Sequence, residues 1–428
     1  MNRYRTILHS DLNSFYSSVE MMLNPALQGK AVAVCGSTED RHGIVLAKSE
    51  KAKKAGVKTG MVNWEAKQRC PDLIIVPPQY DQYLKYSELT RSIYLRYTDL
   101  VEPFGMDECW CDVTGCLKSG IEIAEEIRKA TRDELGLTVS IGVSFNKIFA
   151  KLGSDMKKPD AITVITPENY QELVWPLPAS DLLYVGRATA KKLSDYFIHT
   201  IGDIAKTEPE FLQRRLGING LALWQFAMGT DQSRVKPIDY VVPVKSIGHG
   251  ITCTADLLTE DEVYRVMIEL SQDIGHRLRL HKLAATGVQI TIKNGNLSYR
   301  QYQAPLAFAT QSPQEISLKG KELFSRNYNW AVPVRAVTIR AINLVPQGAP
   351  LQTSLYFDSE RVLRRERLED TIEDIRRRFG SHAIYSAACM GDLKMPGHRD
   401  HEVIMPSMFP GKDLLFVKKQ KAILLLTE

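Results

Sequence analysis

The sequence predicts a protein of several domains in which α-helices and β-strands are mixed, the α/β or α+β class. Up to about residue 170, short β-branched runs alternate with segments whose apolar positions repeat at helical spacing. From about 175 to 235 the pattern is short and helical, and a strand-like alternation follows. With 428 residues, 44% of them hydrophobic, the chain is long enough for two to four domains.

The first part of the chain contains three predicted strands and one predicted helix that bear on function. The strands are expected at residues 5–12, 31–36 and 137–144, where β-branched residues concentrate. Residues 119–136 have apolar positions at helical spacing and end in Gly136, a typical helix C-cap. This alternation predicts a sheet covered by helices.

A basic hairpin is predicted in the second half of the chain. Residues 288–293 alternate apolar and polar side chains and reach Asn294 and Gly295, a strong turn signal. Between Arg234 and Leu344 there are 14 Lys and Arg against 9 Asp and Glu, which accounts for the whole formal net charge of +5. Half-buried antiparallel strands commonly have a solvated polar face, so the pattern alone does not indicate a ligand.

Composition argues against a secreted or membrane protein. The seven cysteines form no disulfide-like framework, no charged and then apolar leader precedes Asp11, and no apolar run approaches roughly 20 residues. We therefore expect a cytoplasmic protein without a membrane role. Cys109, Cys111 and Cys116 lack a second Cys pair or a His pair, so a structural role is favoured over a zinc site.

Three acids stand where strands are expected to end. Asp11 closes the first strand, and the turn after it leads into a helix whose first N–H groups favour an anion. Asp107 and Glu108 are adjacent, so they reach one site only if a hairpin tip or bulge breaks the strand alternation. Together the three could hold two Mg²⁺ ions roughly 3.5–4 Å apart for phosphoryl transfer. Capping or solvent-facing acids at strand ends are the alternative.

These segments resemble, in order, the motifs of the Y-family DNA polymerases, and the bacterial DinB/UmuC branch fits best. The opening motif is similar to HSDLNSFYSSVE, the second carboxylate motif to GMDECWCDVTG and the palm segment to SIGVSFNKIFAKLGSDMKKP. With VKSIGHGIT, the resemblance extends over about residues 5–345. It implies a right-handed polymerase with palm, fingers, a small helical thumb and a C-terminal α/β little finger.

The resemblance also implies domain limits. These are 1–14 and 81–168 for the palm, 15–80 for the fingers, 169–236 for the thumb, 242–345 for the DNA-binding little finger, and 346–428 for a C-terminal extension. In the thumb, Gly186 matches the second glycine of a helix-hairpin-helix turn and Tyr184 replaces the first, so an altered turn is expected.

The resemblance assigns catalysis and metal binding to Asp11, Asp107 and Glu108, with the Leu12 carbonyl as a further ligand of two Mg²⁺ ions. The residues expected around the nucleotide are Leu12, Asn13, Ser14, Phe15, Tyr16, Lys53 and Lys158. Tyr16 matches the steric gate that excludes a 2′-hydroxyl, and Lys158 matches the lysine that meets the triphosphate. Glu50 and Lys53 replace the usual Tyr and Arg, and Glu50 is expected to point away from the phosphates.

The implied function is a translesion DNA polymerase of the DNA damage response, a monomer that adds dNTPs to a primer on template DNA. Gln352, Leu355 and Tyr356 resemble the peptide that binds the bacterial sliding clamp, with a simple strand edge as the alternative. Two other functions stay open. One is a catalytically silent scaffold tethered to the clamp, and the other is a nucleotidyl cyclase, which would leave the basic second half unexplained.

Overall fold

The computed structural model describes residues 4–349, 359–380 and 383–396. These residues fall into two compact units. The first comprises residues up to 36 together with 44–242, and the second comprises 37–43 with the described residues from 243 onward. The mixed α/β class that the sequence predicts is confirmed in both units.

The first unit is built on a five-stranded sheet in the order β5-β6-β1-β7-β8. Its central strand β1 pairs antiparallel with β6 and with β7, and β7 pairs in parallel with β8. All six residues of β1 and all six residues of β7 are buried. The strands are β5 (Val101–Phe104), β6 (Glu108–Asp112), β1 (Ile7–Leu12), β7 (Val139–Ser144) and β8 (Ile162–Val164).

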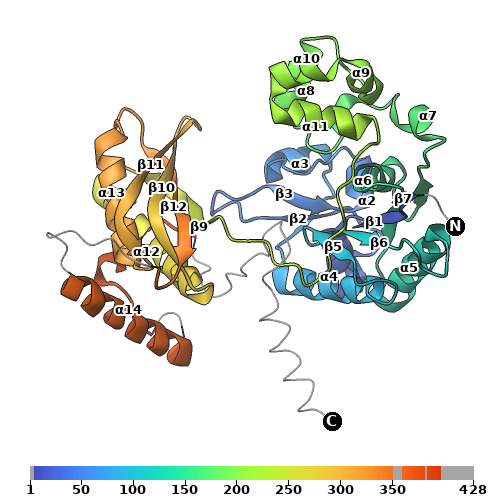
Figure 1. Ribbon diagram of the computed structural model, residues 1–428. Coiled ribbons are helices and arrows are strands. Elements are labelled where there is room, and N and C mark those ends of the chain that lie inside the picture. Colours follow the sequence, from blue (N-terminus) through green and yellow to red (C-terminus); the bar gives the residue numbers. More distant parts are fainter. Residues whose placement is uncertain (1–3, 350–358, 381–382, 397–428) are drawn as a thin grey trace. The chain divides into compact units, whose positions relative to one another are not determined.

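Helices cover both faces of this sheet (Figure 1). α4 (Tyr80–Tyr94) and α5 (Gly120–Leu135) share a core with Leu8 and its neighbours on one face. α6 (Lys147–Met156) packs on the other face, close to Gly142 of β7, where any side chain would collide with the backbone of Ala150. This close approach brings the polar side chains of α6 near those of β1.

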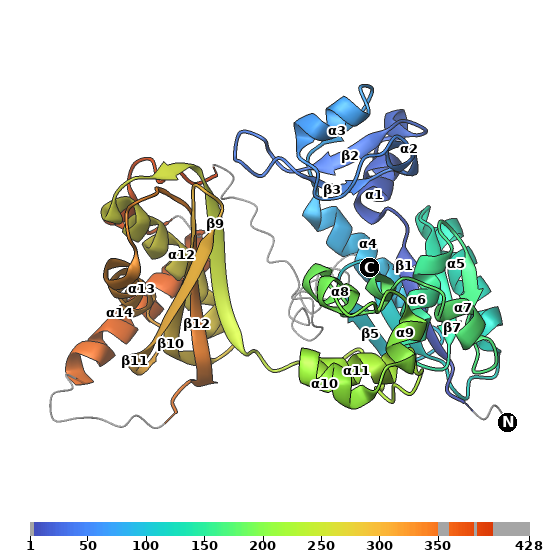
Figure 2. The ribbon, with the colours of Figure 1, turned by 90° about the horizontal axis from the view of Figure 1, so that it is seen from above.

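A three-stranded sheet, ordered β3-β2-β4, forms a separate block that α1 and α4 connect to the five-stranded sheet (Figure 2). Its core consists of small and branched apolar residues such as Ala33, Val45 and Leu73. The elements here are α1 (Phe15–Leu23), η1 (Pro25–Leu27), β2 (Val32–Cys35), β3 (Val45–Lys48), α2 (Glu50–Lys54), α3 (Asn63–Arg69) and β4 (Ile74–Val76).

Short helices follow β8 and share an apolar core with α6. Tyr184 lies in the turn before α8 and has φ 71°, the left-handed conformation that favours glycine. The turn thus accommodates Tyr184 in a glycine-like conformation, and Gly186 is the N-cap of α8. The helices are α7 (Tyr170–Val174), η2 (Ala179–Asp181), α8 (Arg187–Ser194), α9 (Ile201–Lys206), α10 (Pro209–Leu216) and α11 (Ile218–Ala227).

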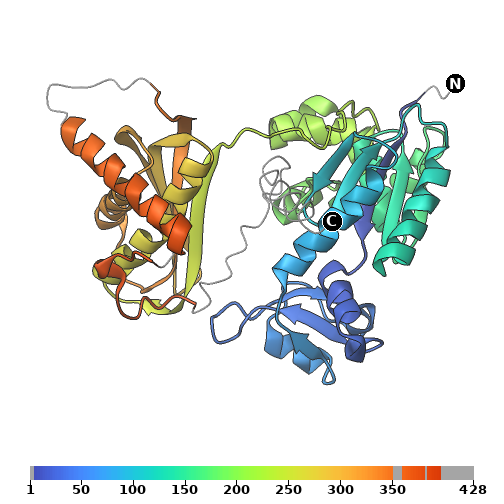
Figure 3. The same ribbon diagram turned by 90° about the horizontal axis from the view of Figure 1, so that it is seen from below.

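The second unit is a four-stranded antiparallel sheet in the order β11-β10-β12-β9, with α12 and α13 packed on one face. α14 lies beside α12 (Figure 3), where Arg279 pairs with Glu369 at 2.8 Å. The elements are β9 (Ser246–Leu257), α12 (Glu260–Leu280), β10 (Leu283–Asn294), β11 (Tyr299–Thr310), α13 (Pro313–Asn327), β12 (Val334–Pro346), α14 (Ser359–Phe379) and η3 (Ala387–Cys389).

The local predictions are confirmed. The strands predicted at 5–12, 31–36 and 137–144 are β1, β2 and β7, and the helix ending at Gly136 is α5, with Gly136 at φ 65°. The predicted hairpin joins β10 to β11.

The two faces of β10 also alternate as predicted. Val288, Ile290 and Ile292 are buried, whereas Gln289 and Thr291 form side-chain hydrogen bonds across to β11. Within the three described stretches of chain, none of the helices combines the length and the apolar composition that a bilayer crossing requires.

Candidate active site

Asp11 and Glu108 lie directly opposite each other in the antiparallel pairing of β1 with β6. Opposed residues of such a pair direct their side chains to the same face, and here it is the face that α6 covers. Asp107 lies in the turn between β5 and β6, where Gly105 has φ 81°. Asp107 and Glu108 therefore do not alternate along one strand, and the hairpin tip is the alternative that the structure confirms.

Hydrogen bonds hold this turn against its surroundings. The Leu12 N–H donates to the Asp107 carbonyl at 3.0 Å, and the Ser87 hydroxyl of α4 donates to the Met106 carbonyl at 2.5 Å. The Leu12 bond thus joins the backbone next to Asp11 directly to the turn that carries Asp107.

The proximity of the three acids is reflected in their pKa values. Burial raises the pKa of Asp107 to about 7, and the charges of Asp11 and Glu108 add to this effect. Burial also raises the pKa of Asp11 to about 6, although the ammonium of Lys158 opposes the shift. A cation placed near Asp11 and Asp107 would stabilise the charged form of both carboxylates and lower their pKa values.

Glu108 is held by a lysine and a histidine. Burial alone would raise its pKa, but the contacts with His9 and Lys151 lower the pKa to about 2. His9 Nε2 lies 3.2 Å from the carboxylate, and burial lowers the pKa of this fully buried imidazole to about 4. His9 is therefore neutral near pH 7, and Lys151 supplies the positive charge that Glu108 meets.

Lys158 binds two acids at once. Its Nζ lies 2.6 Å from Asp11 Oδ2 and 2.8 Å from Asp155 Oδ1. Burial opposes the charge on this ammonium, but Asp11 and Asp155 raise the pKa of Lys158 overall. Lys158 thus remains protonated next to the position where the triphosphate is expected.

The chemistry of the acidic cluster fits hard divalent cations. Its donors are carboxylate oxygens, the ligands that Mg²⁺ prefers, and two of these carboxylates carry raised pKa values that a cation would reverse. In the structure, Lys158 forms an ion pair with Asp11 and Lys151 forms one with Glu108. Among the described residues, no three His, Cys, Asp or Glu side chains converge in a metal-binding geometry. Loading would require the lysines to move.

Of the residues that follow Asp11, some pack in the core and others lie next to the three acids. Asn13 and Phe15 are buried; the Asn13 side chain donates to Thr138 and accepts from Ser140, so it faces β7. The ring of Tyr16 stacks on Tyr83, with centroids 4.2 Å apart and planes within 8° of each other. Asn13 and Phe15 thus support the backbone of the site.

Glu50 contacts two of the residues that are expected around the nucleotide, Ser14 and Lys53. Its orientation away from the phosphates stays a prediction. Ser14 has φ 48°, and its hydroxyl donates to Glu50 Oε1 at 2.9 Å. Glu50 Oε2 lies 3.8 Å from Lys53 Nζ, so the carboxylate joins Ser14 to Lys53. The partial neutralisation by Lys53 and the hydroxyl hydrogen bond explain why a carboxylate is stable there.

Three residues of this network were not singled out from the sequence: His9, Lys151 and Asp155. His9 lies two residues before Asp11 in a strand, so its side chain shares the face of Asp11. Lys151 and Asp155 are four residues apart on α6, which places them on one helix face. These spacings were readable signals, although many buried histidines and surface Lys-Asp pairs share them.

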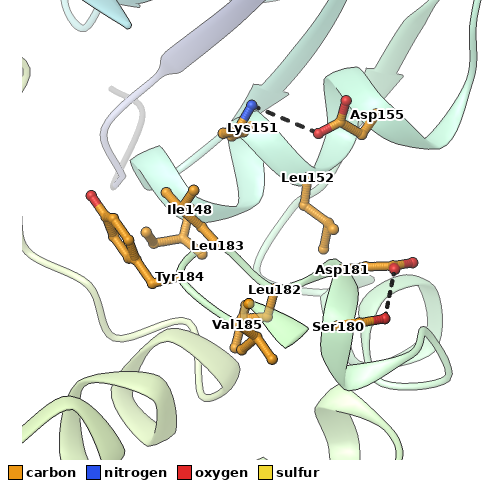
Figure 4. Close-up of a pocket in the computed structure, with 11 residues that line it drawn as sticks. Ile148, Lys151, Leu152, Asp155, Ser180, Asp181, Leu182, Leu183, Tyr184 and Val185 are labelled. Carbon is orange, nitrogen blue, oxygen red and sulfur yellow. Dashed lines mark hydrogen bonds and ion pairs between the residues drawn. The ribbon is translucent and has the colours of Figure 1, made fainter. Parts of the chain in front are cut away.

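A cavity of about 390 Å³ adjoins Lys151 and Asp155. Figure 4 shows the residues that line it. Its other walls are apolar side chains of α6, the turn that contains Tyr184, and the polar residues Ser180 and Asp181 of η2. The predicted clamp-binding residues Gln352, Leu355 and Tyr356 lie outside the described residues.

Known proteins are similar to most of this chain. Residues 10–155 match the impB/mucB/samB family, and residues 244–355 match the C-terminal domain of that family. A DNA polymerase IV from Acetivibrio thermocellus is 47% identical over 391 residues, which cover 91% of this chain and 98% of the relative. DNA polymerase IV 1 of Bacillus subtilis is 36% identical, covering 90% of this chain and 93% of the relative. A solved Y-family DNA polymerase chimera shares the fold, with a TM-score of 0.71 at 23% identity over 80% of this chain and 100% of that one.

Proposed function

This chain belongs to the impB/mucB/samB family of Y-family DNA polymerases, is itself a translesion DNA polymerase, and we propose that Asp11, Asp107 and Glu108 carry its chemistry. The observation that carries the proposal is the direct pairing of Asp11 with Glu108 across β1 and β6, with Asp107 in the adjoining turn. The substrates are primer-template DNA and dNTPs.

The three carboxylates, with the Leu12 carbonyl, would hold two Mg²⁺ ions. When bound, these ions lower the cost of charge on the attacking 3′-oxygen and on the leaving pyrophosphate. The protein itself positions the carboxylates through the β1–β6 register and the Leu12 to Asp107 hydrogen bond.

Other side chains of the site bind and select the nucleotide. The ammonium of Lys158 stabilises the triphosphate as negative charge grows on the leaving group. The ring of Tyr16, fixed by stacking on Tyr83, packs against the sugar and leaves no room for a 2′-hydroxyl. Lys53, held by Glu50 near Ser14, adds a second positive charge for the phosphates.

The remaining domains bind DNA and the sliding clamp. We assign the palm to 1–14 and 81–168, the fingers to 15–80, the thumb to 169–236, the little finger to 242–345 and an extension to 346–428. The polar face of the little-finger sheet follows the DNA backbone. Gln352, Leu355 and Tyr356 bind the sliding clamp, and alanine substitution of all three is expected to abolish capture of the clamp while DNA binding persists.

Pyrophosphate release from dNTPs, measured with and without primer-template DNA, tests this function. Pyrophosphate release is expected only when both primer and template are present. Release without DNA would support the cyclase alternative. DNA binding with no release in Mg²⁺ would support the silent scaffold.

A further inference from the structure

Asp155 is shared by the two lysines that hold the catalytic acids. Asp155 Oδ1 lies 2.8 Å from Lys158 Nζ, and Asp155 Oδ2 lies 3.8 Å from Lys151 Nζ. Lys158 also contacts Asp11 at 2.6 Å, and Lys151 also contacts Glu108. One carboxylate thus offers one oxygen to each lysine, and each lysine has its other contact on a metal-ligand candidate.

Divalent cations and these ammonium groups compete for the same oxygens. Lys158 occupies Asp11 Oδ2 and Lys151 occupies Glu108 Oε2. A cation bound to those oxygens would lie within a few ångströms of two like charges, which repel it strongly at this depth of burial. Each lysine must therefore move, and a displaced ammonium without an acidic partner would weaken metal binding.

Asp155 is well placed to take both lysines. Its side chain is 48% exposed, so its charge costs little desolvation, whereas the side chains of Lys151 and Lys158 are only 14% and 26% exposed. Lys151 and Asp155 both line the 390 Å³ cavity (Figure 4), which gives the Lys151 side chain space to swing away from Glu108.

We propose that Asp155 is a positioning residue that receives Lys151 and Lys158 when divalent cations displace them from Glu108 and Asp11. The exchange breaks two ion pairs with catalytic acids and strengthens two that already exist with Asp155. It leaves Lys158 charged and close to the site, where it can meet the triphosphate. The inference rests on the proposed metal site and concerns how that site is loaded.

The test measures Mn²⁺ affinity of the full chain bound to primer-template DNA, from the electron paramagnetic resonance signal of free Mn²⁺. Asp155→Asn is expected to weaken Mn²⁺ binding about tenfold, a typical coupling within a charge network. Asp155→Glu should retain most of the affinity. Asp133→Asn is the control: it removes the same charge from α5, at a side chain that is 52% exposed beside Arg132. It should leave the Mn²⁺ affinity unchanged.

A second experiment separates this role from a general electrostatic effect of the Asp155 charge on the metal and from a folding defect. In a Lys151→Met/Lys158→Met background, Asp155→Asn should change Mn²⁺ affinity less than about twofold, because no displaced lysine remains. An undiminished effect in that background, or parental affinity in the single variant, would overturn the inference. Asp107→Asn reports on the metal site itself, so parental affinity in that variant would refute the proposed ligands instead.

Discussion

The Glu108 carboxylate and the Asp11 carboxylate extend from paired positions of β6 and β1. Glu108 is held by Lys151 of α6, and Asp11 by Lys158, which follows the end of α6. The strand pairing fixes where the acids lie, whereas the lysines fix their charge balance before substrate arrives. A site arranged in this way combines a rigid backbone with side-chain contacts that can exchange. Its consequences can be tested residue by residue.

Replacing Tyr16 with alanine is expected to relax sugar selection. The ring is immobilised between Tyr83, which it stacks on, and Tyr80, which it meets edge-on at 6.1 Å. Forcing a 2′-hydroxyl against a fixed ring costs roughly 1–3 kcal/mol, so ribonucleotide incorporation should rise about tenfold or more in Tyr16→Ala. Single-nucleotide incorporation of dNTPs and rNTPs measures the ratio.

Tyr16→Phe is the control for the gate, because it keeps the ring and removes only the hydroxyl. Its sugar selection should match that of the parent. Unchanged selection in Tyr16→Ala would assign the discrimination to another residue.

Asp107→Asn is expected to stabilise the metal-free protein at high pH. The folded-state pKa of Asp107 is about 7, above its ordinary value of 3.8, so the charged carboxylate destabilises the folded state above pH 7. This penalty shrinks as the pH falls from about 7 towards about 4, because the folded protein then binds a proton. Thermal unfolding in chelator should therefore show a gain for Asp107→Asn at about pH 8 that vanishes near pH 4. A gain that is equal at both values would contradict the assigned pKa.

Glu102 is expected to be important for stability because it neutralises a buried lysine. Its carboxylate accepts from Lys147 Nζ at 2.7 Å and from the Lys236 N–H at 2.9 Å, and both paired side chains are about 90% buried. Glu102→Ala leaves the Lys147 charge without its partner beside Trp110, which should cost about 3–5 kcal/mol in denaturant unfolding.

The exposed pair of Arg96 with Glu134 provides the comparison. Glu134→Ala breaks an ion pair of 2.5 Å whose side chains are 48% and 44% exposed, so its effect should be far smaller. Equal losses in the two variants would show that burial does not decide the contribution.

Lys293 and Arg340 are expected to contribute to DNA affinity through charge. They lie on the polar face of the β11-β10-β12-β9 sheet, where Gln289 pairs with Arg340. Gly248 and Gly250 of β9 leave room there for Arg340 and Thr338, since a side chain at either glycine would crowd them. Alanine at Lys293 or Arg340 should lower the slope of log affinity against log salt by about one each.

Lys319 provides the control for the salt experiment. It lies on α13, which packs on the opposite face of the sheet, and pairs with Glu322 at 2.6 Å. Lys319→Ala should leave the slope unchanged. A loss equal to that of Lys293→Ala would move the DNA contact away from the polar sheet face.

Local pattern was sufficient to predict the strand that ends in Asp11, the helix that ends at Gly136 and the hairpin after Lys293. Each of these depends on neighbours in sequence, through strand alternation, a C-cap and a turn. The sequence alone left Asp107 and Glu108 open between a strand and a hairpin tip. Gly105 decides this in the structure, because its φ of 81° begins the turn.

The contacts that the sequence did not predict join residues far apart in the chain. Glu50 meets Ser14 across 36 positions, and Lys151 meets Glu108 across 43. No periodicity encodes such pairs, because they depend on how α2 lies next to the start of α1 and how α6 packs on the five-stranded sheet. The same limit applies to Tyr184, where the backbone imposes a left-handed conformation on a side chain that rarely adopts it.

Single-turnover primer extension by the parent, Asp107→Asn and Glu108→Gln, with Mg²⁺ and dNTPs on a defined template, tests the central assignment most directly. Both substitutions keep the size of the side chain and remove the charge. The parent should extend the primer, and both variants should lose roughly a thousandfold in rate while they bind DNA as tightly as the parent. Extension at the parental rate by either variant would contradict the assignment of the chemistry to these acids.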